Sequence, residues 1–136
     1  MEKIYSKIEP GNLLHVVGNI DDISEGRCDV TTEQEALQMA IIKGNTGKRF
    51  EAHKHLEVKK ENNITQESII VIAGVLKAVF YDLDDTILQE VELLPSDYCM
   101  TFRGGHFFEM IEDGTKVFEF KNGPYLGQSN DKAWIK

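Results

Sequence analysis

Two histidines one residue apart, His53 and His55, are the residues of this chain most suited to chemistry. If the stretch KRFEAHKHLE forms a strand, both imidazoles lie on one face, about 7 Å apart along the strand. Arg49 and Glu51 share that face and are candidate substrate-binding residues. Two neutral imidazoles placed in this way can bind one metal ion, provided that other strands supply the remaining ligands.

Glu67 and His106 are the best candidates for those further ligands. Glu67 opens the apolar stretch ESIIVIAG, and His106 follows Arg-Gly-Gly, where small residues allow close backbone approach. Three imidazoles and one carboxylate suit one divalent transition metal, such as Fe, Mn, Ni or Zn, and leave coordination positions for water or substrate. The fourth histidine, His15, has no partner at ligand spacing, so we expect it to be structural.

The spacing of these residues resembles the first sequence motif of the cupin family, G-x5-H-x-H-x(3,4)-E-x6-G. Gly47 and His53 are separated by five residues, as in the first half of the motif, and Glu67 and Gly74 by six, as in its second half. The chain departs from the motif between the two halves, where eleven residues separate His55 from Glu67. The cupin resemblance therefore implies a metal site formed by His53, His55, Glu67 and His106.

The departure from the motif predicts an enlarged loop or projecting hairpin at about residues 57–66. Its sequence is polar and offers little to bury, so we expect it to be more mobile than the strands. Glu57 and Glu61 lie in or beside this insertion and are alternative carboxylate ligands to Glu67.

The second cupin motif is present in outline. LPSD at Leu94–Asp97 resembles the usual Leu-Pro-Gly-Asp turn, and GGH at Gly104–His106 stands where the last metal histidine would fall. The motif's internal proline and its terminal asparagine are absent. Arg103, just before the glycine pair, is a candidate to hold a carboxylate or phosphate by a bidentate contact. The stretch Glu119–Gly127 also resembles the tails of small stand-alone bacterial cupins.

The same residues predict an all-β fold. From Glu67 onward, apolar and β-branched stretches end in Gly, Asp, Asn or Pro turns at the spacing of a sandwich or small barrel. The resemblance makes this a cupin-type antiparallel β-barrel or jelly roll, with residues 1–136 as one domain. The motif-bearing barrel spans about 37–127, and residues 1–36 add extra strands or a dimer arm. The stretch TTEQEALQMAIIKGN fits either a short capped helix or a strand from about Leu37, and we favour the strand.

The resemblance implies a metal-binding cupin that acts on or binds a small polar molecule, such as a sugar derivative or a carboxylate. A non-catalytic binding or regulatory module is an alternative. A metal-free sugar ketoisomerase or epimerase is another, because AHKHLE resembles the AHK-x-LE stretch of dTDP-sugar ketoisomerases, with His53 and His55 as acid and base. These alternatives leave open whether the protein is an enzyme.

The composition and charge of the chain limit the classes of molecule that we expect it to bind. A formal net charge of −8 argues against nucleic acid and anionic membranes, because both bind clustered Lys and Arg. No apolar run approaches the roughly 20 residues of a membrane span. The N-terminal stretch lacks an apolar leader, and the two cysteines form no Cys-x-x-Cys pattern, so we expect a cytoplasmic protein. The cupin resemblance further implies a homodimer.

Overall fold

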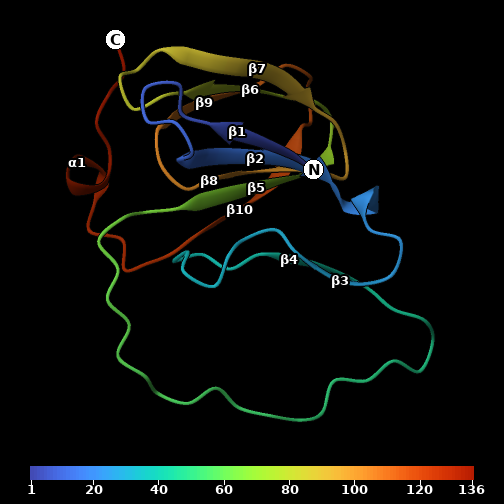
Figure 1. The fold of residues 1–136 in the computed structure, drawn as a ribbon. Helices are drawn as coiled ribbons and strands as arrows, with labels where there is room; N and C mark the ends of the chain where they lie inside the picture. The colour runs from blue at the N-terminus through green and yellow to red at the C-terminus, as the bar shows by residue number, and fades with distance from the viewer.

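The computed structural model describes all residues from Met1 to Lys136 and shows an all-β protein with antiparallel sheets (Figure 1). A five-stranded sheet has the order β1-β2-β8-β5-β10, a three-stranded sheet has the order β7-β6-β9, and β3 and β4 form a separate pair. The ten strands are β1 (Glu2–Tyr5), β2 (Leu13–Asn19), β3 (Gly26–Asp29), β4 (Ala40–Lys43), β5 (Glu67–Ala73), β6 (Leu76–Tyr81), β7 (Ile87–Leu93), β8 (Asp97–Thr101), β9 (Gly105–Met110) and β10 (Lys116–Lys121).

The strands expected after Glu67 are confirmed, and the turns between them use the residues that the sequence pattern indicated. Between β5 and β6, Gly74 has a φ of 74°, and a Cβ there would lie 2.7 Å from the Cα of Thr115. Between β7 and β8, the LPSD turn closes with Asp97 N–H donating to the Leu94 carbonyl at 2.9 Å. The Asp97 carboxylate also accepts from Leu94 N–H at 2.7 Å. Local turn chemistry therefore accounts for the order of these strands.

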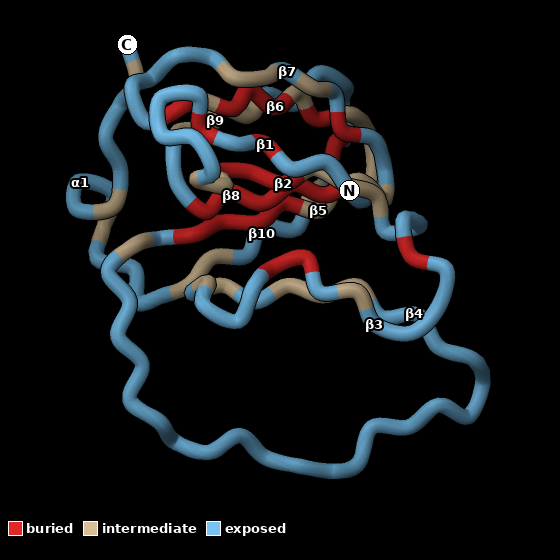
Figure 2. The backbone as a smooth tube through the Cα atoms, viewed as in Figure 1, coloured by how far each residue is buried: buried red, intermediate tan, exposed pale blue.

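Two apolar clusters hold the layers together, as the buried positions in Figure 2 show. The larger lies between the five-stranded and three-stranded sheets, because alternate residues of β5 and β8 point inward. Its buried members are Ile4, Ile69, Val71, Leu76, Ala78, Phe80, Leu93 and Cys99. The smaller lies on the outer face of the five-stranded sheet, under the β3–β4 hairpin. Its buried members are Val16, Val30, Tyr98, Met100 and Phe102.

The N-terminal third contains strands and no α-helix. The favoured strand interpretation of residues 37–43 is confirmed, although β4 begins at Ala40. Thr32 and Glu35 do not open a helix. Instead, Glu35 N–H donates to the Thr32 carbonyl at 3.2 Å in a turn. β1 and β2 are part of the five-stranded sheet, so residues 1–36 contribute to the main core as well as to the β3–β4 hairpin.

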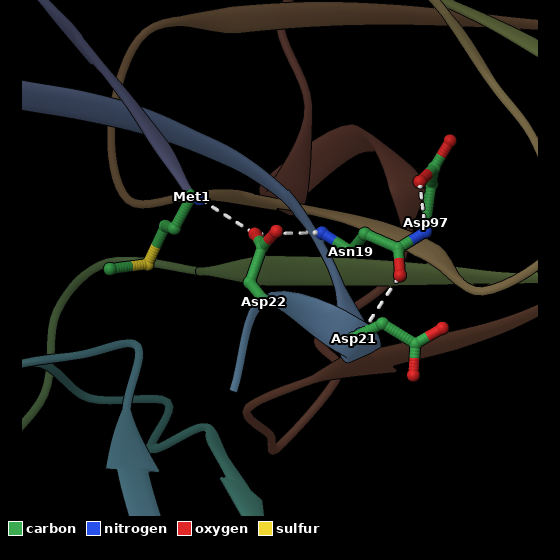
Figure 3. A network of polar contacts seen from close by, with 5 residues as sticks. All are labelled: Met1, Asn19, Asp21, Asp22 and Asp97. Atoms are coloured by element: carbon green, nitrogen blue, oxygen red, sulfur yellow. Dashed lines mark hydrogen bonds and ion pairs between the residues drawn. The ribbon is translucent and has the colours of Figure 1, made fainter. Parts of the chain in front are cut away.

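A polar network fixes the start of the chain to the end of β2 (Figure 3). The 3₁₀ helix η1 (Ile20–Asp22) is capped by Asn19, whose side chain accepts from Asp21 N–H at 2.8 Å and donates to Asp97 at 2.7 Å. The Asp22 carboxylate accepts from the Met1 ammonium at 2.6 Å and from Asn19 N–H at 3.1 Å. The bond from the ammonium lowers the pKa of Asp22 below its usual value.

Residues 44–66 form no strand. They run as a wide arc away from the sheets (Figures 1 and 2) and are exposed from Gly44 to Asn63. The arc returns at Gln66, whose side chain is 1% exposed and accepts from Leu37 N–H at 2.9 Å. The predicted insertion at 57–66 is thus exposed along most of its length but anchored in the core at its last residue.

None of the helices in the structure has the length and apolar character needed to span a membrane.

Candidate functional site

A row of directly paired residues crosses the five-stranded sheet near one end of its strands. His15 on β2 is opposite Thr101 on β8, Thr101 is opposite Glu67 on β5, and Glu67 is opposite Lys121 on β10. Directly paired residues of antiparallel strands project to the same face. On β5, Glu67 shares its face with Ile69 and Val71 of the larger apolar cluster, so this face is the inner one, toward the three-stranded sheet. The row places polar groups at the end of an otherwise apolar interior.

His106 meets this row from the opposite sheet. It lies on β9, where it pairs with Phe80 of β6, and its Nε2 is 3.3 Å from Oε1 of Glu67. Its ring packs against Phe108 with centroids 4.8 Å apart. Two of the four predicted metal ligands are therefore brought together, one from each sheet.

The Glu67–His106 pair is mostly shielded from water, with side chains 10% and 25% exposed. Burial opposes ionisation of Glu67, but the contact with His106 and the positive charges of Lys132 and Lys121 outweigh it. The pKa of Glu67 is consequently held below its usual value, and Glu67 is ionised at neutral pH. The second ring nitrogen of His106, Nδ1, is buried and has no hydrogen-bond partner in the protein.

The pair lines a cavity of about 830 Å³ between the sheets. Ile69, Leu76, Phe108 and Val117 form part of its apolar lining. The polar lining combines Glu67 and His106 with Arg103 and with residues of the C-terminal segment, including Lys132. A cavity of this size, mostly apolar with a few convergent polar groups, is typical of a small-molecule site.

Some charged side chains that line the cavity already have hydrogen-bond or ion-pair partners within the protein, and others are in no ion pair. Asp82 accepts from the Ser6 hydroxyl at 2.6 Å and from Lys7 N–H at 2.7 Å, and Glu119 pairs with Lys121 at 3.3 Å. Arg103 and Lys132, by contrast, take part in none of the ion pairs of the structure. Two acids of the lining are likewise in no ion pair: Asp85, in an exposed turn, and Asp131, whose carboxylate accepts from the Thr65 hydroxyl at 2.7 Å.

His15 has a structural role beneath this site. It is fully buried, with Nε2 3.0 Å from the Tyr81 carbonyl and Nδ1 3.1 Å from the Thr101 hydroxyl. Because a carbonyl only accepts, Nε2 carries the proton and Nδ1 accepts from Thr101. Burial lowers the pKa of His15 to about 4. His15 also supports the turn before β9, where Gly104, with a φ of 79°, lies directly against the Tyr81 carbonyl.

His53 and His55 lie elsewhere, so the expectation that they occupy one face of a strand is wrong. Both are in the exposed arc, where their ring centroids are 5.3 Å apart and His53 Nδ1 is 2.7 Å from the Glu51 carbonyl. The polar sequence around them provides no apolar face to pair against a sheet. Arg49 is exposed in the same arc.

The alternative carboxylates Glu57 and Glu61 are also exposed in the arc, and Glu61 pairs with Lys59 at 2.6 Å. No three His, Cys, Asp or Glu side chains gather in the structure in an arrangement that would hold a metal ion.

The sequence interpretation missed the C-terminal contribution to the cavity. Asp131, Lys132, Ala133, Trp134 and Ile135 all line it, following the short helix α1 (Gln128–Asp131). The stretch SNDKAWIK begins with turn residues but has no strand alternation, so no local pattern would have predicted this position. Its only signal is the presence of the chain's one tryptophan in a polar segment.

Searches of protein-family models, of curated proteins and of solved structures found no match to this chain.

Proposed function

We propose that this protein binds a small polar molecule with an anionic group, such as a carboxylate or a sugar derivative bearing one, in the cavity between its sheets. The contact between Glu67 and His106 inside that cavity carries the proposal. It places a shielded polar pair at the end of an apolar pocket. The unpaired cations Arg103 and Lys132 are suited to the anionic group, since charge-assisted bonds to carboxylate or phosphate are the stronger ones.

The pair also has the groups for proton transfer. Glu67 is ionised and can accept a hydrogen bond from the Nε2–H of His106. In the imidazole tautomer that carries its proton on Nε2, Nδ1 has a free lone pair. Because Nδ1 is buried, a bound hydroxyl or acidic C–H group would reach this base only after part of the cavity lining moves. The Glu67 carboxylate would then stabilise the imidazolium that forms. Binding is the proposed function, and proton transfer is the chemistry that this geometry would support in an enzyme.

We further propose that the fold is of the cupin type. Two facing antiparallel sheets support this assignment, as does the meeting of Glu67 and His106, which come from the two resembling motifs. The positive φ values of Gly47 and Gly74, at the two glycine positions of the first motif, are also consistent with it.

The metal site implied by the resemblance does not fit the side chains as they are placed. Glu67 and His106 offer one oxygen and one nitrogen ligand, while His53 and His55 lie in the exposed arc. We therefore derive no chemical step through a metal, and metal binding stays a prediction. The metal-free isomerase alternative meets the same difficulty, because it assigns acid and base to His53 and His55.

Titration calorimetry with gluconate, citrate, glucose 6-phosphate and glucose tests the proposal. We expect at least one of the three anions to bind, and Glu67→Gln and His106→Asn each to weaken its binding tenfold or more. Glu109→Gln is the matched control, because Glu109 is an exposed residue of β9 that does not line the cavity. Unchanged affinity in both site variants would refute the proposed site.

A further inference from the structure

We propose that residues Asp131–Ile135 form a wall of the binding cavity, held in place by Ile135 against Gly105, and that Lys132 on this wall selects an anionic group. The C-terminal segment follows α1 along one edge of both sheets (Figure 1). All five residues line the cavity that contains Glu67 and His106. The part of the inference that concerns Lys132 rests on the proposed binding of a small molecule in this cavity.

The position of the wall depends on the absence of a side chain at Gly105. A Cβ built at this residue would overlap Cδ1 of Ile135, and it would lie 3.3 Å from the Tyr81 Cβ. Gly105 is a strand residue without a positive φ, so its backbone conformation does not require glycine. The glycine instead provides the space that the Ile135 side chain occupies, which is half-buried there.

A second contact fixes the start of the wall. The Thr65 hydroxyl donates to the Asp131 carboxylate at 2.7 Å, which ties the C-terminal segment to the residue before Gln66. Between these two contacts Lys132, Ala133 and Trp134 are exposed, and the Trp134 side chain shows 75% exposure. Because so few contacts hold the wall, its detachment should cost little compared with global unfolding.

Lys132 gives the wall its chemical selectivity. Its charge acts on Glu67 inside the cavity and it forms no ion pair of its own. The carboxylate of the neighbouring acid Asp131 accepts from the Thr65 hydroxyl and forms no ion pair with Lys132. An anionic group that enters beside His106 would therefore meet an unpaired ammonium group, whereas a neutral molecule of the same shape would gain nothing from it.

Backbone ¹⁵N–¹H NMR tests the wall without any added molecule. In the wild-type protein, the heteronuclear NOE of residues 131–135 should be close to that of the strands. Gly105→Ala and Ile135→Ala should lower it while the strand amides keep their shifts. Ile87→Ala is the matched control, because Ile87 is an exposed residue of β7 that does not line the cavity. Low NOE values in the wild type, or no effect of either wall variant, would show that residues 131–135 are not held in place by the contact between Ile135 and Gly105.

Titration calorimetry with gluconate, glucose 6-phosphate and glucose tests the selectivity. We expect a carboxylate or phosphate to bind at least tenfold more tightly than glucose, and Lys132→Ala to remove most of that preference. Lys136→Ala, which changes an exposed lysine of the same segment, should keep it. If an anion binds the wild type but Lys132→Ala retains the preference, the inference is wrong while the proposed function stands. If none of gluconate, glucose 6-phosphate and citrate binds, the anionic assignment and the proposed function both fail, and the NMR result still decides whether the wall exists.

Discussion

Acidification should destabilise this protein through the buried His15. Burial lowers the pKa of His15 from 6.5 to about 4, while in the unfolded chain it returns to about 6.5. Between these two values the unfolded state binds more protons than the folded state, so stability falls as the pH falls. The contribution of neutral His15 is complete above pH 6.5 and is lost progressively toward pH 4.

The size of this effect follows from the pKa difference. Each unit of pKa difference corresponds to about 1.4 kcal/mol, so complete titration would cost roughly 3 kcal/mol of unfolding free energy. Between pH 7 and pH 5 the expected loss is about 2 kcal/mol. Burial is the largest cause of the lowered His15 pKa, and positive charge on His106 acts in the same direction, whereas the hydrogen bond with the Tyr81 carbonyl and the Asp82 carboxylate act in the opposite direction.

Urea unfolding at pH 7, 6 and 5 measures this loss. The wild-type protein should lose about 2 kcal/mol over that range, and His15→Gln, which does not titrate, should lose much less. If His15→Gln does not fold, imidazole ¹⁵N NMR of the wild type provides an independent test. It should show a neutral ring protonated at Nε2 down to pH 5. A His15 that titrates near pH 6.5, or a variant with the same pH dependence as the wild type, would show that His15 is not the source of the loss.

Three further predictions concern the turns, the arc and the metal. In urea unfolding, Gly74→Ala should lower the unfolding free energy by about 1–2 kcal/mol from backbone strain alone, and by more in total because its Cβ would meet Thr115. Gly114→Ala is the control: Gly114 has a φ of 80° but lies in open space, so this variant should show only the strain. Deleting residues 57–61 from the exposed arc should preserve cooperative thermal unfolding, whereas Gln66→Ala should lower the melting temperature. A deletion that abolishes the cooperative transition would show that the arc belongs to the core. Elemental analysis of untagged protein tests the metal prediction. Stoichiometric metal that is lost in both His55→Ala and His106→Ala would mean that the arc reaches the cavity. Metal retained in both variants would exclude the predicted site of His53, His55, Glu67 and His106.

The strands after Glu67 could be predicted because their signals are local. Apolar alternation and turn residues such as those of LPSD act over a few positions, and β5 to β10 follow them. The meeting of Glu67 and His106 was predictable only through the resemblance to two motifs, since no local signal pairs β5 with the opposite sheet.

The remaining parts of the site depend on contacts that a local pattern does not specify. His53 and His55 have strand-like spacing, but a strand also needs a partner and an apolar face to bury, and their neighbours in the arc are exposed. The contact between Ile135 and Gly105 joins two segments that share no sequence periodicity. Such a contact becomes visible only once the sheets have brought the two residues together.

The most direct test of the central claim is a ¹⁵N NMR titration of the His106 imidazole with glucose 6-phosphate. Both ring nitrogens of His106 should shift in a saturable manner, and Glu67→Gln should weaken this response at least tenfold. Saturable binding of glucose 6-phosphate that leaves the His106 resonances unchanged, or an identical titration in Glu67→Gln, would show that the molecule does not bind at the Glu67–His106 pair.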